Sequence, residues 1–444
     1  MAANERVDED LQALQAMVGA EGVQLAQTQP QAWQDWMRQV LNQPQQLQWV
    51  VSPNTPEELA SVVAKAAQHR WKMLPSGSGS KLAWGGLVAG VDLLISTARL
   101  NRIIEHAIGD LTVTVEAGTR LADLQALLAK AGQFLPIDAA YPQQATIGGI
   151  VATADSGSWR QRYGGVRDML LGLSFVRSDG QLAKAGGRVV KNVAGYDLMK
   201  LLTGSYGTLG IMTQLTLRVY PLPETAQTIV LSGEASSIAQ VTQTLLNSAL
   251  TPTAIDLLSP ALVDRLNLGK GTGFAVRFQS ILPSVNEQAS RLGELAQQQG
   301  LTCIRLTDAE EVALWQRLAE AMQPSPTSNA ITCKIGIQPT EAVNVLNMLE
   351  QAGDRAVLGR VHVGSGVGYL VLPESASSPA SLTKMRLHFQ NNGGFLSILQ
   401  APASLKQQVD VWGYQGNALD LMKTLKHQFD PLHLLSPHRF VGGI

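Results

Sequence analysis

The chain has 444 residues, 45% of them hydrophobic, and a formal net charge of −1 at pH 7. This length indicates two or three domains with room for a sizeable core, and the balanced charge argues against nucleic acid as a partner. The first residues, MAANERVDED, are acidic and lack the apolar stretch of a signal peptide, and no apolar run is long enough to span a membrane. We therefore expect a cytoplasmic protein.

Two cysteines, Cys303 and Cys333, limit the redox chemistry that the chain can hold. A zinc site or an iron–sulfur cluster needs about four ligands, so we expect neither, and no other metal site is predicted. Buried, unreactive thiols are the expected case. If the chain carries out redox chemistry, its electrons must pass to oxygen or to something outside the chain.

Residues 1–48 are predicted to form an N-terminal extension, and an α/β pattern begins at Trp49. Thr55 is followed by a proline and two acidic residues, which is the composition of a helix N-terminus. We expect this helix to end near Arg70.

Further along the chain, short apolar runs predict strands at 91–95 and 111–116. Thr119 is expected to cap a helix over 120–131, which Gly132 ends. The sequence Ser-Asp-Gly at 178–180 predicts a hairpin turn.

The loop PSGSGSKLAWGG, residues 75–86, alternates glycine and serine. Such a loop makes successive backbone amides available as donors, which suits a pyrophosphate. The loop has neither the GxGxxG string of a Rossmann domain nor the GxxxxGK string of a phosphate-binding P-loop.

The run from Tyr141 to Arg218 holds 13 of the 41 glycines in 78 residues, so they are concentrated there. Glycine allows positive φ and close approach of the backbone to a ligand. One interpretation is a cradle of backbone donors around a large, planar, anionic cofactor. The other is a sheet interrupted by tight turns, which glycine content alone favours.

Three segments favour the cofactor. TIGG at 146–149 is preceded by Pro142 and followed by small residues, so a flat group could lie against it, and Thr146 could cap a helix. The second segment, 162–165, places a cation and an aromatic ring beside two glycines. The third, KNVAGYDLMKLLTGSYGTLGIMT at 191–213, has glycines at every third residue before an alternating strand pattern.

These segments resemble the flavin-binding domain of the vanillyl-alcohol oxidase and p-cresol methylhydroxylase (PCMH) family, and within it the FAD-binding subunits of bacterial glycolate oxidase. The resemblance implies an α+β fold with a two-subdomain PCMH-type FAD-binding domain at 49–221. An α+β cap domain with one antiparallel sheet should follow at 222–410, where helical and strand patterns alternate. The segment 411–444, with FDPLHLLSPHRF, should return to the FAD domain.

The resemblance also implies FAD as the cofactor. Family members that attach FAD covalently through the glycine–serine loop have a histidine where this chain has Ser80 and Lys81, so we expect non-covalent binding. The cofactor-binding residues that it implies are Pro75, Ser76, Gly77, Ser78, Gly79, Ser80, Pro142, Thr146, Ile147, Gly148, Gly149, Ala152, Thr153, Gly157, Arg162, Tyr163, Gly164, Gly210 and Ile211.

The catalytic base is not evident from the sequence. Related hydroxy-acid dehydrogenases carry a His-x-Gly-Asp-Gly-Asn string, whereas HVGSGVGYL keeps His362 but has Ser365 and Val367 in place of the Asp and Asn. Tyr369 replaces a second histidine. The site therefore looks eroded, and His362 is predicted to be an ordinary histidine at a strand end. Weak catalytic candidates are His362, Arg439 and Lys191.

The resemblance implies an FAD subunit that takes part in oxidising glycolate to glyoxylate and passes electrons to a partner subunit. A larger flavin subunit and an iron–sulfur subunit would be the partners, and any association with a membrane would come through them. Two alternatives stay open: a flavin protein that mainly holds such a complex together, and a stand-alone FAD reductase of the peptidoglycan-precursor type.

Overall fold

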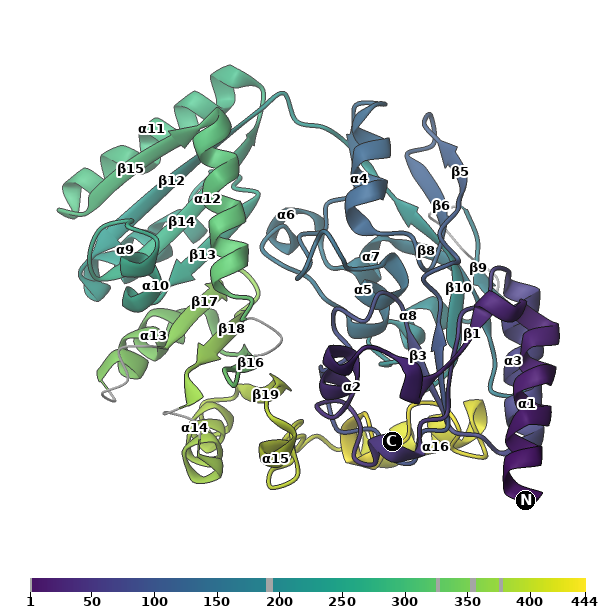
Figure 1. Cartoon of the computed structure of the whole chain (residues 1–444). Coiled ribbons are helices and arrows are strands. Elements are labelled where there is room, and N and C mark those ends of the chain that lie inside the picture. The colour runs from purple at the N-terminus through teal and green to yellow at the C-terminus, as the bar shows by residue number, and fades with distance from the viewer. Residues whose placement is uncertain (1, 189–194, 325–327, 352–356, 375–377) are drawn as a thin grey trace.

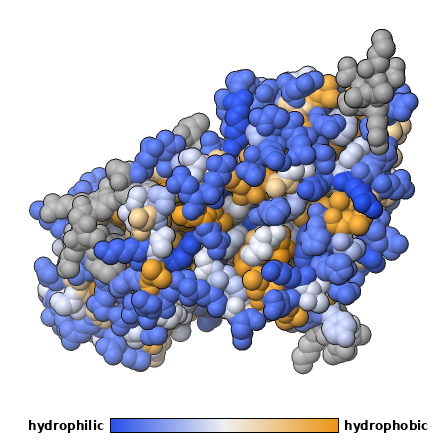
Figure 2. Space-filling view, turned by 90° about the horizontal axis from the view of Figure 1, so that it is seen from below, coloured by the Kyte–Doolittle hydropathy of each residue, from blue (hydrophilic) through white to orange (hydrophobic). Residues whose placement is uncertain are grey.

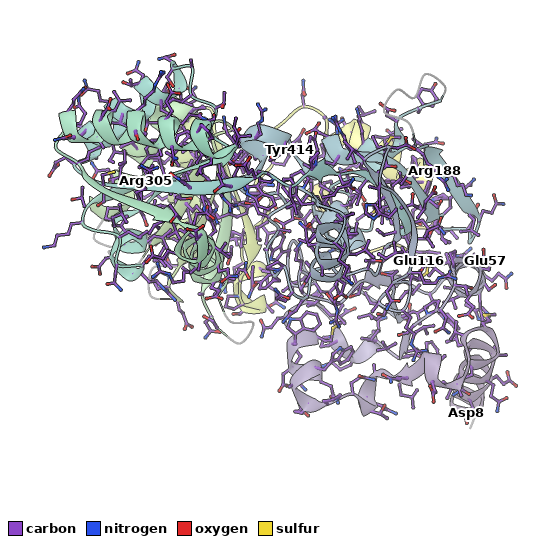
Figure 3. All side chains as sticks on the ribbon, turned by 90° about the horizontal axis from the view of Figure 1, so that it is seen from above. Asp8, Glu57, Glu116, Arg188, Arg305 and Tyr414 are labelled. Atoms are coloured by element: carbon purple, nitrogen blue, oxygen red, sulfur yellow. The ribbon has the colours of Figure 1, made fainter. Side chains whose placement is uncertain are left out.

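The structure is a computed structural model that describes residues 2–188, 195–324, 328–351, 357–374 and 378–444. The described residues form two lobes, with the first half of the chain in one and β12 to β19 in the other (Figure 1). Arg188 on the first lobe and Arg305 on the second lie at opposite ends of the molecule (Figure 3).

The first lobe begins with a four-stranded sheet in the order β1-β2-β4-β3. β1 pairs antiparallel with β2, while β2 and β3 flank β4 in parallel. Helices α1 and α3 pack on this sheet through buried aliphatic side chains. The elements are α1 (Ala2–Val18), β1 (Val23–Leu25), α2 (Gln31–Met37), β2 (Trp49–Val51), α3 (Pro56–His69), β3 (Met73–Ser76) and β4 (Leu93–Ser96).

Helix α3 begins as the sequence predicts. The Thr55 hydroxyl accepts a hydrogen bond from the backbone N–H of Glu58 at 3.1 Å, and Arg70 ends the helix in the left-handed conformation. The N-terminal residues are not separate from this lobe, because β1 forms the edge of its sheet.

A five-stranded antiparallel sheet in the order β5-β6-β10-β8-β9 completes the first lobe, together with the small pair β7 and β11. The hairpin expected at 178–180 joins β8 to β9. The elements are β5 (Ile103–Ala107), β6 (Thr112–Glu116), α4 (Leu121–Ala129), β7 (Gln133–Phe134), α5 (Ile147–Thr153), α6 (Arg160–Tyr163), α7 (Val166–Met169), β8 (Leu170–Val176), β9 (Leu182–Gly186), α8 (Leu198–Leu202), β10 (Ile211–Arg218) and β11 (Tyr220–Pro221).

The helix expected at 120–131 is present as α4, but Thr119 does not cap it. The backbone N–H and C=O of Thr119 bond to Glu116 and Ile147, which ties the residue into the loop before the helix. Its hydroxyl is buried without a hydrogen-bond partner among the described residues.

The second lobe is built on one eight-stranded antiparallel sheet in the order β15-β12-β14-β13-β17-β18-β16-β19, as the sequence predicts. The elements are β12 (Thr225–Gly233), α9 (Ala235–Leu246), β13 (Ala254–Leu258), α10 (Pro260–Arg265), β14 (Thr272–Ser280), α11 (Leu282–Gln298), β15 (Thr302–Thr307), α12 (Asp308–Ala321), β16 (Ile331–Gly336), α13 (Ala342–Gln351), β17 (Leu358–His362), β18 (Val367–Leu372), α14 (Pro379–Asn391) and β19 (Phe395–Gln400). Of the two cysteines, Cys333 in β16 is buried as expected, whereas Cys303 in β15 is exposed.

The two faces of this sheet differ. One face is apolar and is covered by α9, α11, α13 and α14. On the other face, α10 and α12 cover an apolar part, and a polar part lies toward the first lobe. Residues directly opposite each other on antiparallel strands share a face, so Asp256 lies beside His362, and Arg360, Tyr369 and Lys334 form a row.

The C-terminal residues return to the first lobe, as the sequence predicts. After α15 (Ala403–Lys406) and α16 (Leu419–Phe429), Leu435 pairs in parallel with Met73 of β3. The buried ammonium of Lys426 bonds to the Asp430 carboxylate at 2.6 Å and to the carbonyls of Thr208 and Leu435. The C-terminal segment therefore closes one side of the first lobe.

Seen from below, the surface is mostly hydrophilic, and hydrophobic residues form separate patches (Figure 2). No helix within the described ranges is long and apolar enough to cross a membrane.

Candidate active site

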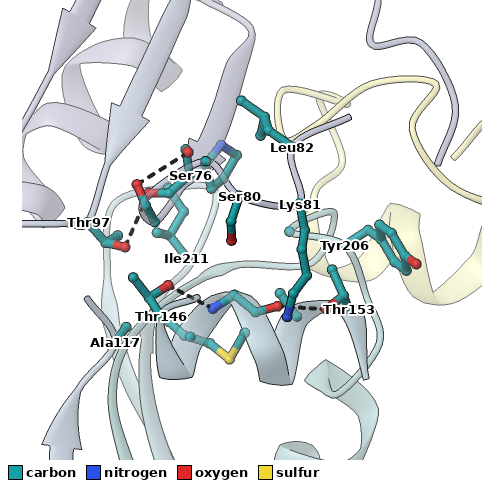
Figure 4. A pocket seen from close by; sticks show the side chains of 18 of the residues that line it. Ser76, Ser80, Lys81, Leu82, Thr97, Ala117, Thr146, Thr153, Tyr206 and Ile211 are labelled. Carbon is teal, nitrogen blue, oxygen red and sulfur yellow. Dashed lines mark hydrogen bonds between the residues drawn. The ribbon is translucent and has the colours of Figure 1, made fainter. Parts of the chain in front are cut away.

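A pocket opens in the first lobe where the glycine–serine loop, the start of α5 and the start of β10 meet (Figure 4). The lining residues are Pro75, Ser76, Gly77, Gly79, Ser80, Lys81, Leu82, Thr97, Ala117, Ala145, Thr146, Gly148, Gly149, Ala152, Thr153, Tyr206, Gly207, Gly210, Ile211, Met212 and Arg439.

Thr146 organises the floor of this pocket. Its hydroxyl accepts a hydrogen bond from the backbone N–H of Gly149 at 3.2 Å and so caps α5, as the sequence predicts. The loop packs directly on this cap: a Cβ on Gly77 would lie 2.1 Å from the Thr146 hydroxyl oxygen. A Cβ on Gly149 would meet only that oxygen, at 3.1 Å, so the first turn of α5 presents bare backbone to the pocket.

Arg439 supplies a positive charge to the same pocket. One of its terminal nitrogens donates to the carbonyl of Leu82 at 2.8 Å. The other is buried without a hydrogen-bond partner among the described residues. Because an unsatisfied buried guanidinium is costly, the pocket suits a ligand that carries negative charge. With the exposed backbone of the loop and of α5, these groups fit FAD.

Most of the residues that the sequence assigned to the cofactor line this pocket. The exceptions from the TIGG and loop segments have clear causes. Ser78 is exposed and its hydroxyl donates to the carbonyl of Gln144, Pro142 is exposed, and Ile147 is buried in the core behind α5. Gly157 lines a second cavity instead.

The segment Arg162–Gly165 does not reach the pocket. The ring of Tyr163 makes edge contacts with the rings of Phe134 and Tyr220, so it packs the core rather than a ligand. Arg162 is exposed, and Gly164 ends α6 with φ of 80°. Lys191 lies outside the described residues.

Several residues that line this pocket were not among those assigned to the cofactor from the sequence. Lys81 stands in the loop 75–86, directly after its alternating glycines and serines, and Gly207 belongs to the spaced glycines, so both carried a signal. Thr97, Ala117 and Tyr206 are ordinary residues in their own segments, and only the packing of distant strands brings them to the pocket.

The second cavity lies between the two lobes. It is lined by Trp84, Asp138, Ala139, Ala140, Tyr141, Asp155, Ser156, Gly157, Ala319, Met322, Gln323, Thr332, Arg360, His362 and Tyr369. The Lys81 ammonium, in the wall of the first pocket, lies 2.7 Å from a carboxylate oxygen of Asp155 in the wall of the second. This ion pair joins the two sites.

His362 is the last residue of β17, so it lies at a strand end, as expected. Its side chain is nevertheless buried, with 3% exposed. Nδ1 lies 2.6 Å from a carboxylate oxygen of Asp256 on the neighbouring strand β13. Nε2 is buried without a partner among the described residues, in a residue that lines the second cavity.

Asp256 is held as a carboxylate. Burial alone would raise its pKa, but Arg360 and His362, together with hydrogen bonds from His362 and Ser158, lower the pKa well below its usual range. Arg360 contacts the carboxylate at 2.7 Å. Burial raises the pKa of Asp138, the other acid nearby. An ionised Asp256 can only accept a hydrogen bond, so Nδ1 of His362 carries the proton and Nε2 is free as a base.

The absence of the Asp and Asn from the string around His362 does not leave this histidine without polar contacts. The hydroxyl of Ser365, in the place of the missing Asp, only turns back toward the carbonyl of His362 at 3.3 Å. Asp256, from a different strand, supplies the carboxylate instead. Polar partners of the histidine are therefore present, although the string around it lacks them.

Lys334 adds an unpaired cation to the polar face of the sheet. It lies opposite Tyr369 in the register of β16 and β18. The described residues offer its ammonium neither a hydrogen bond nor an ion pair within bonding distance. Burial lowers the pKa of Lys334, although the charge of Asp155 opposes this.

The comparisons with known proteins agree with this picture. Residues 47–186 match the family model described as an FAD binding domain. Glycolate oxidase subunit GlcD of Bacillus subtilis is 24% identical over 418 residues, 87% of this chain and 87% of that protein. Glycolate oxidase subunit GlcE of Escherichia coli is 38% identical over 168 residues, 38% of this chain and 47% of that protein.

Among solved structures, p-cresol methylhydroxylase with substrate bound has a TM-score of 0.74 at 13% identity, covering 97% of this chain and 96% of that one. This likeness shows the PCMH-type fold. FAD is the cofactor, and the chain is an FAD-dependent oxidoreductase, as the sequence predicts. The two relatives named above are subunits of an enzyme for glycolate, whose reacting group is a CH–OH.

Proposed function

We propose that the chain oxidises the CH–OH group of a small 2-hydroxy acid, glycolate first of all, in the cavity between the lobes. The observation that carries this proposal is the free Nε2 of His362 in a cavity that the Lys81–Asp155 ion pair joins to the flavin pocket. Oxidation of an alcohol by a flavin needs a base beside the cofactor to take the hydroxyl proton.

FAD, when bound, supplies the acceptor for the hydride, that is, for the two electrons and the hydrogen of the substrate C–H bond. His362 takes the hydroxyl proton on Nε2 as the carbonyl forms. The imidazolium that results lies 2.6 Å from the Asp256 carboxylate, which stabilises its charge and holds the ring in one orientation. Asp256 is thus a positioning residue.

Lys334 is the group that we assign to the substrate carboxylate. It is the cation of the polar sheet face that has no counter-ion among the described residues, whereas Arg360 is paired with Asp256 and Lys81 with Asp155. A carboxylate beside Lys334 would offset the burial that lowers its pKa. The Thr332 hydroxyl, two residues before it, is also buried without a partner in the described part of the chain, and it lines the cavity.

As to its setting, we infer that the chain is the smaller FAD-binding component of a cytoplasmic glycolate-oxidising complex, with a larger flavin subunit and an iron–sulfur subunit as partners. The match to GlcE over 168 residues supports this inference. So does the presence of only two cysteines, which cannot hold a cluster that carries electrons onward. Within the chain, 49–221 would bind FAD and 222–410 would cover the substrate.

Steady-state kinetics with an artificial electron acceptor test the proposal. Lys334→Met should raise KM for glycolate by roughly ten- to a hundredfold, because a hydrogen bond to a charged group contributes about 1.5–3 kcal/mol. Lys334→Arg should recover part of the loss. The exposed Lys423 gives the control, since Lys423→Met should leave KM unchanged. Turnover by the native protein with NADPH but with no 2-hydroxy acid would favour the reductase alternative instead.

A further inference from the structure

One short segment of the first lobe, residues 157–161, docks on the second lobe. Helix α6, which this segment enters, lies at the side of the first lobe that faces the second (Figure 1) and packs near β13. The ring of Trp159 lies 5.6 Å from the guanidinium carbon of Arg277 in β14. Gln161 lies against the turn after β17, where a Cβ added to Gly364 would overlap its side-chain oxygen. The segment therefore contacts the second lobe at two points.

Between these two points, the side chain of Ser158 enters the polar face of the eight-stranded sheet and is fully buried. Its hydroxyl donates to a carboxylate oxygen of Asp256 at 2.5 Å and accepts from the guanidinium of Arg360 at 2.5 Å. The same hydroxyl oxygen lies 3.2 Å from Nδ1 of His362. A single residue of the first lobe thus meets the acid, the cation and the histidine of the second lobe.

The two carboxylate oxygens of Asp256 have different partners. Oδ2 accepts from Ser158 at 2.5 Å and from Arg360 at 2.8 Å. Oδ1 lies 2.6 Å from Nδ1 of His362. Because two donors on Oδ2 fix the rotation of the carboxylate, Oδ1 is held where it accepts the Nδ1 proton. Loss of the Ser158 hydroxyl would remove one of these two donors.

The backbone that carries Ser158 is itself held in place by a carboxylate of the first lobe. One oxygen of Asp138 accepts from the N–H of Ser158 at 2.7 Å, and the other accepts from the N–H of Trp159 at 3.3 Å. A Cβ on Gly157 would overlap the Asp138 carboxylate, so this close approach requires glycine. The first lobe therefore presents the hydroxyl at a fixed place.

We propose that Ser158 is a positioning residue that acts through Asp256, so that docking of the two lobes sets His362 for proton transfer. This inference rests on the proposed oxidation of a 2-hydroxy acid with His362 as the base. The proton of the substrate hydroxyl goes to Nε2, while the Nδ1 proton stays between the ring and Asp256. Ser158 keeps its own bonds throughout. Its contribution is orientation, and a small misplacement of a catalytic group is enough to slow a reaction strongly.

Steady-state turnover of glycolate by the FAD-loaded, full-length protein tests this role. Ser158→Ala should lower kcat and kcat/KM together by roughly ten- to 150-fold, which is what a hydrogen bond to a charged group typically contributes. An equal fall in both constants indicates an interaction used in the transition state, so KM should stay the same. Ser158→Thr keeps the hydroxyl and should recover part of kcat.

The matched control is Ser178→Ala. It removes another buried hydroxyl of the first lobe, one that donates to the carbonyl of Phe429 at 2.8 Å, far along the chain. This variant should lose some stability but keep the native kcat. A native kcat in Ser158→Ala, or a fall no larger than that in Ser178→Ala, would overturn the proposal.

A second measurement does not depend on turnover. The Nδ1 proton of His362, held by the carboxylate, should give a far-downfield proton NMR resonance in the native holoprotein, and its loss in His362→Gln assigns it. In Ser158→Ala this resonance should move upfield or broaden, whereas Ser178→Ala should leave it in place. An unchanged resonance in Ser158→Ala would overturn the positioning role. A changed resonance in a protein whose flavin glycolate does not reduce would support that role and contradict the proposed function alone.

Discussion

Asp256 and His362, which are 106 residues apart in the chain, lie in register on adjacent strands with 2.6 Å between carboxylate oxygen and Nδ1. Because the carboxylate accepts the Nδ1 proton, it leaves Nε2 free in the cavity between the lobes. The pair gives the histidine the orientation and tautomer that a general base needs.

This pair predicts the effect of Asp256→Asn. The neutral amide of the asparagine cannot stabilise an imidazolium. Flavin reduction by the hydroxy acid should therefore slow by about 10²–10⁴-fold, which is the rate enhancement that general acid–base catalysis typically contributes. Rapid-mixing measurements of flavin reduction by the hydroxy acid would show this loss.

The matched variants for that experiment are His362→Gln and His427→Gln. The first removes the base itself and should reduce the rate at least as strongly as Asp256→Asn. The second replaces an exposed histidine on α16 and should have no effect. A native rate of flavin reduction in Asp256→Asn would speak against a positioning role.

Gly149→Leu should give a folded protein that binds FAD poorly. The position is helical and meets only the Thr146 hydroxyl oxygen, so a side chain fits the fold but enters the pocket. Overpacking costs about 1–3 kcal/mol, which is a loss of roughly five- to 150-fold in affinity. The FAD content of the purified variant measures cofactor binding, and circular dichroism shows whether the variant is folded.

A glycine in the same conformation and with open space around it gives the control. Gly293→Leu, in the middle of α11, should keep its flavin because nothing lies within 4 Å of its added Cβ. Gly172 in β8 would be a poor control, since its Cβ would lie 2.6 Å from the carbonyl oxygen of Gly187. Equal loss of FAD in both leucine variants would contradict the role of the TIGG turn.

The features that sequence predicts well here are local ones. Thr55 and Thr146 cap helices because each precedes a helical segment at the right spacing, and that spacing is visible in the chain. Thr119 has the same residue type before a helix, but its backbone is committed to the loop, which no local pattern reveals.

The catalytic candidates depend on contacts between distant segments. Asp256 and Lys334 are single charged residues in apolar strands, and nothing nearby marks them as functional. Only the strand order of the eight-stranded sheet puts them on the face that carries His362. For the same reason the motif around His362 looked eroded, although its carboxylate partner comes from elsewhere.

FAD should be dissociable from this chain. The loop carries Ser80 and Lys81 where covalent attachment would need a histidine, and the Lys81 ammonium is paired with Asp155. Acid precipitation of the purified holoprotein should release the yellow colour into the supernatant. Colour that stays with the pellet would contradict non-covalent binding.

Lys426→Met should destabilise the whole first lobe. It leaves the fully buried Asp430 carboxylate without its cation, a change that typically costs about 3–5 kcal/mol. Chemical denaturation should show this loss in the free energy of unfolding. Lys423→Met, an exposed change one turn earlier, should stay within about 0.5 kcal/mol of the native protein. A comparable stability of the two variants would mean that the C-terminal segment is not held by this pair.

The central claim is that a small 2-hydroxy acid gives its hydrogen to FAD with His362 as the base. Anaerobic rapid mixing of the FAD-loaded native protein with glycolate, and with glycolate deuterated at the carbon that bears the hydroxyl, tests it most directly. We predict loss of the visible flavin absorbance, slower with the deuterated substrate, and slower by at least about 10²-fold in His362→Gln. Flavin that stays oxidised with glycolate and with larger 2-hydroxy acids, or a native rate in His362→Gln, would contradict the account.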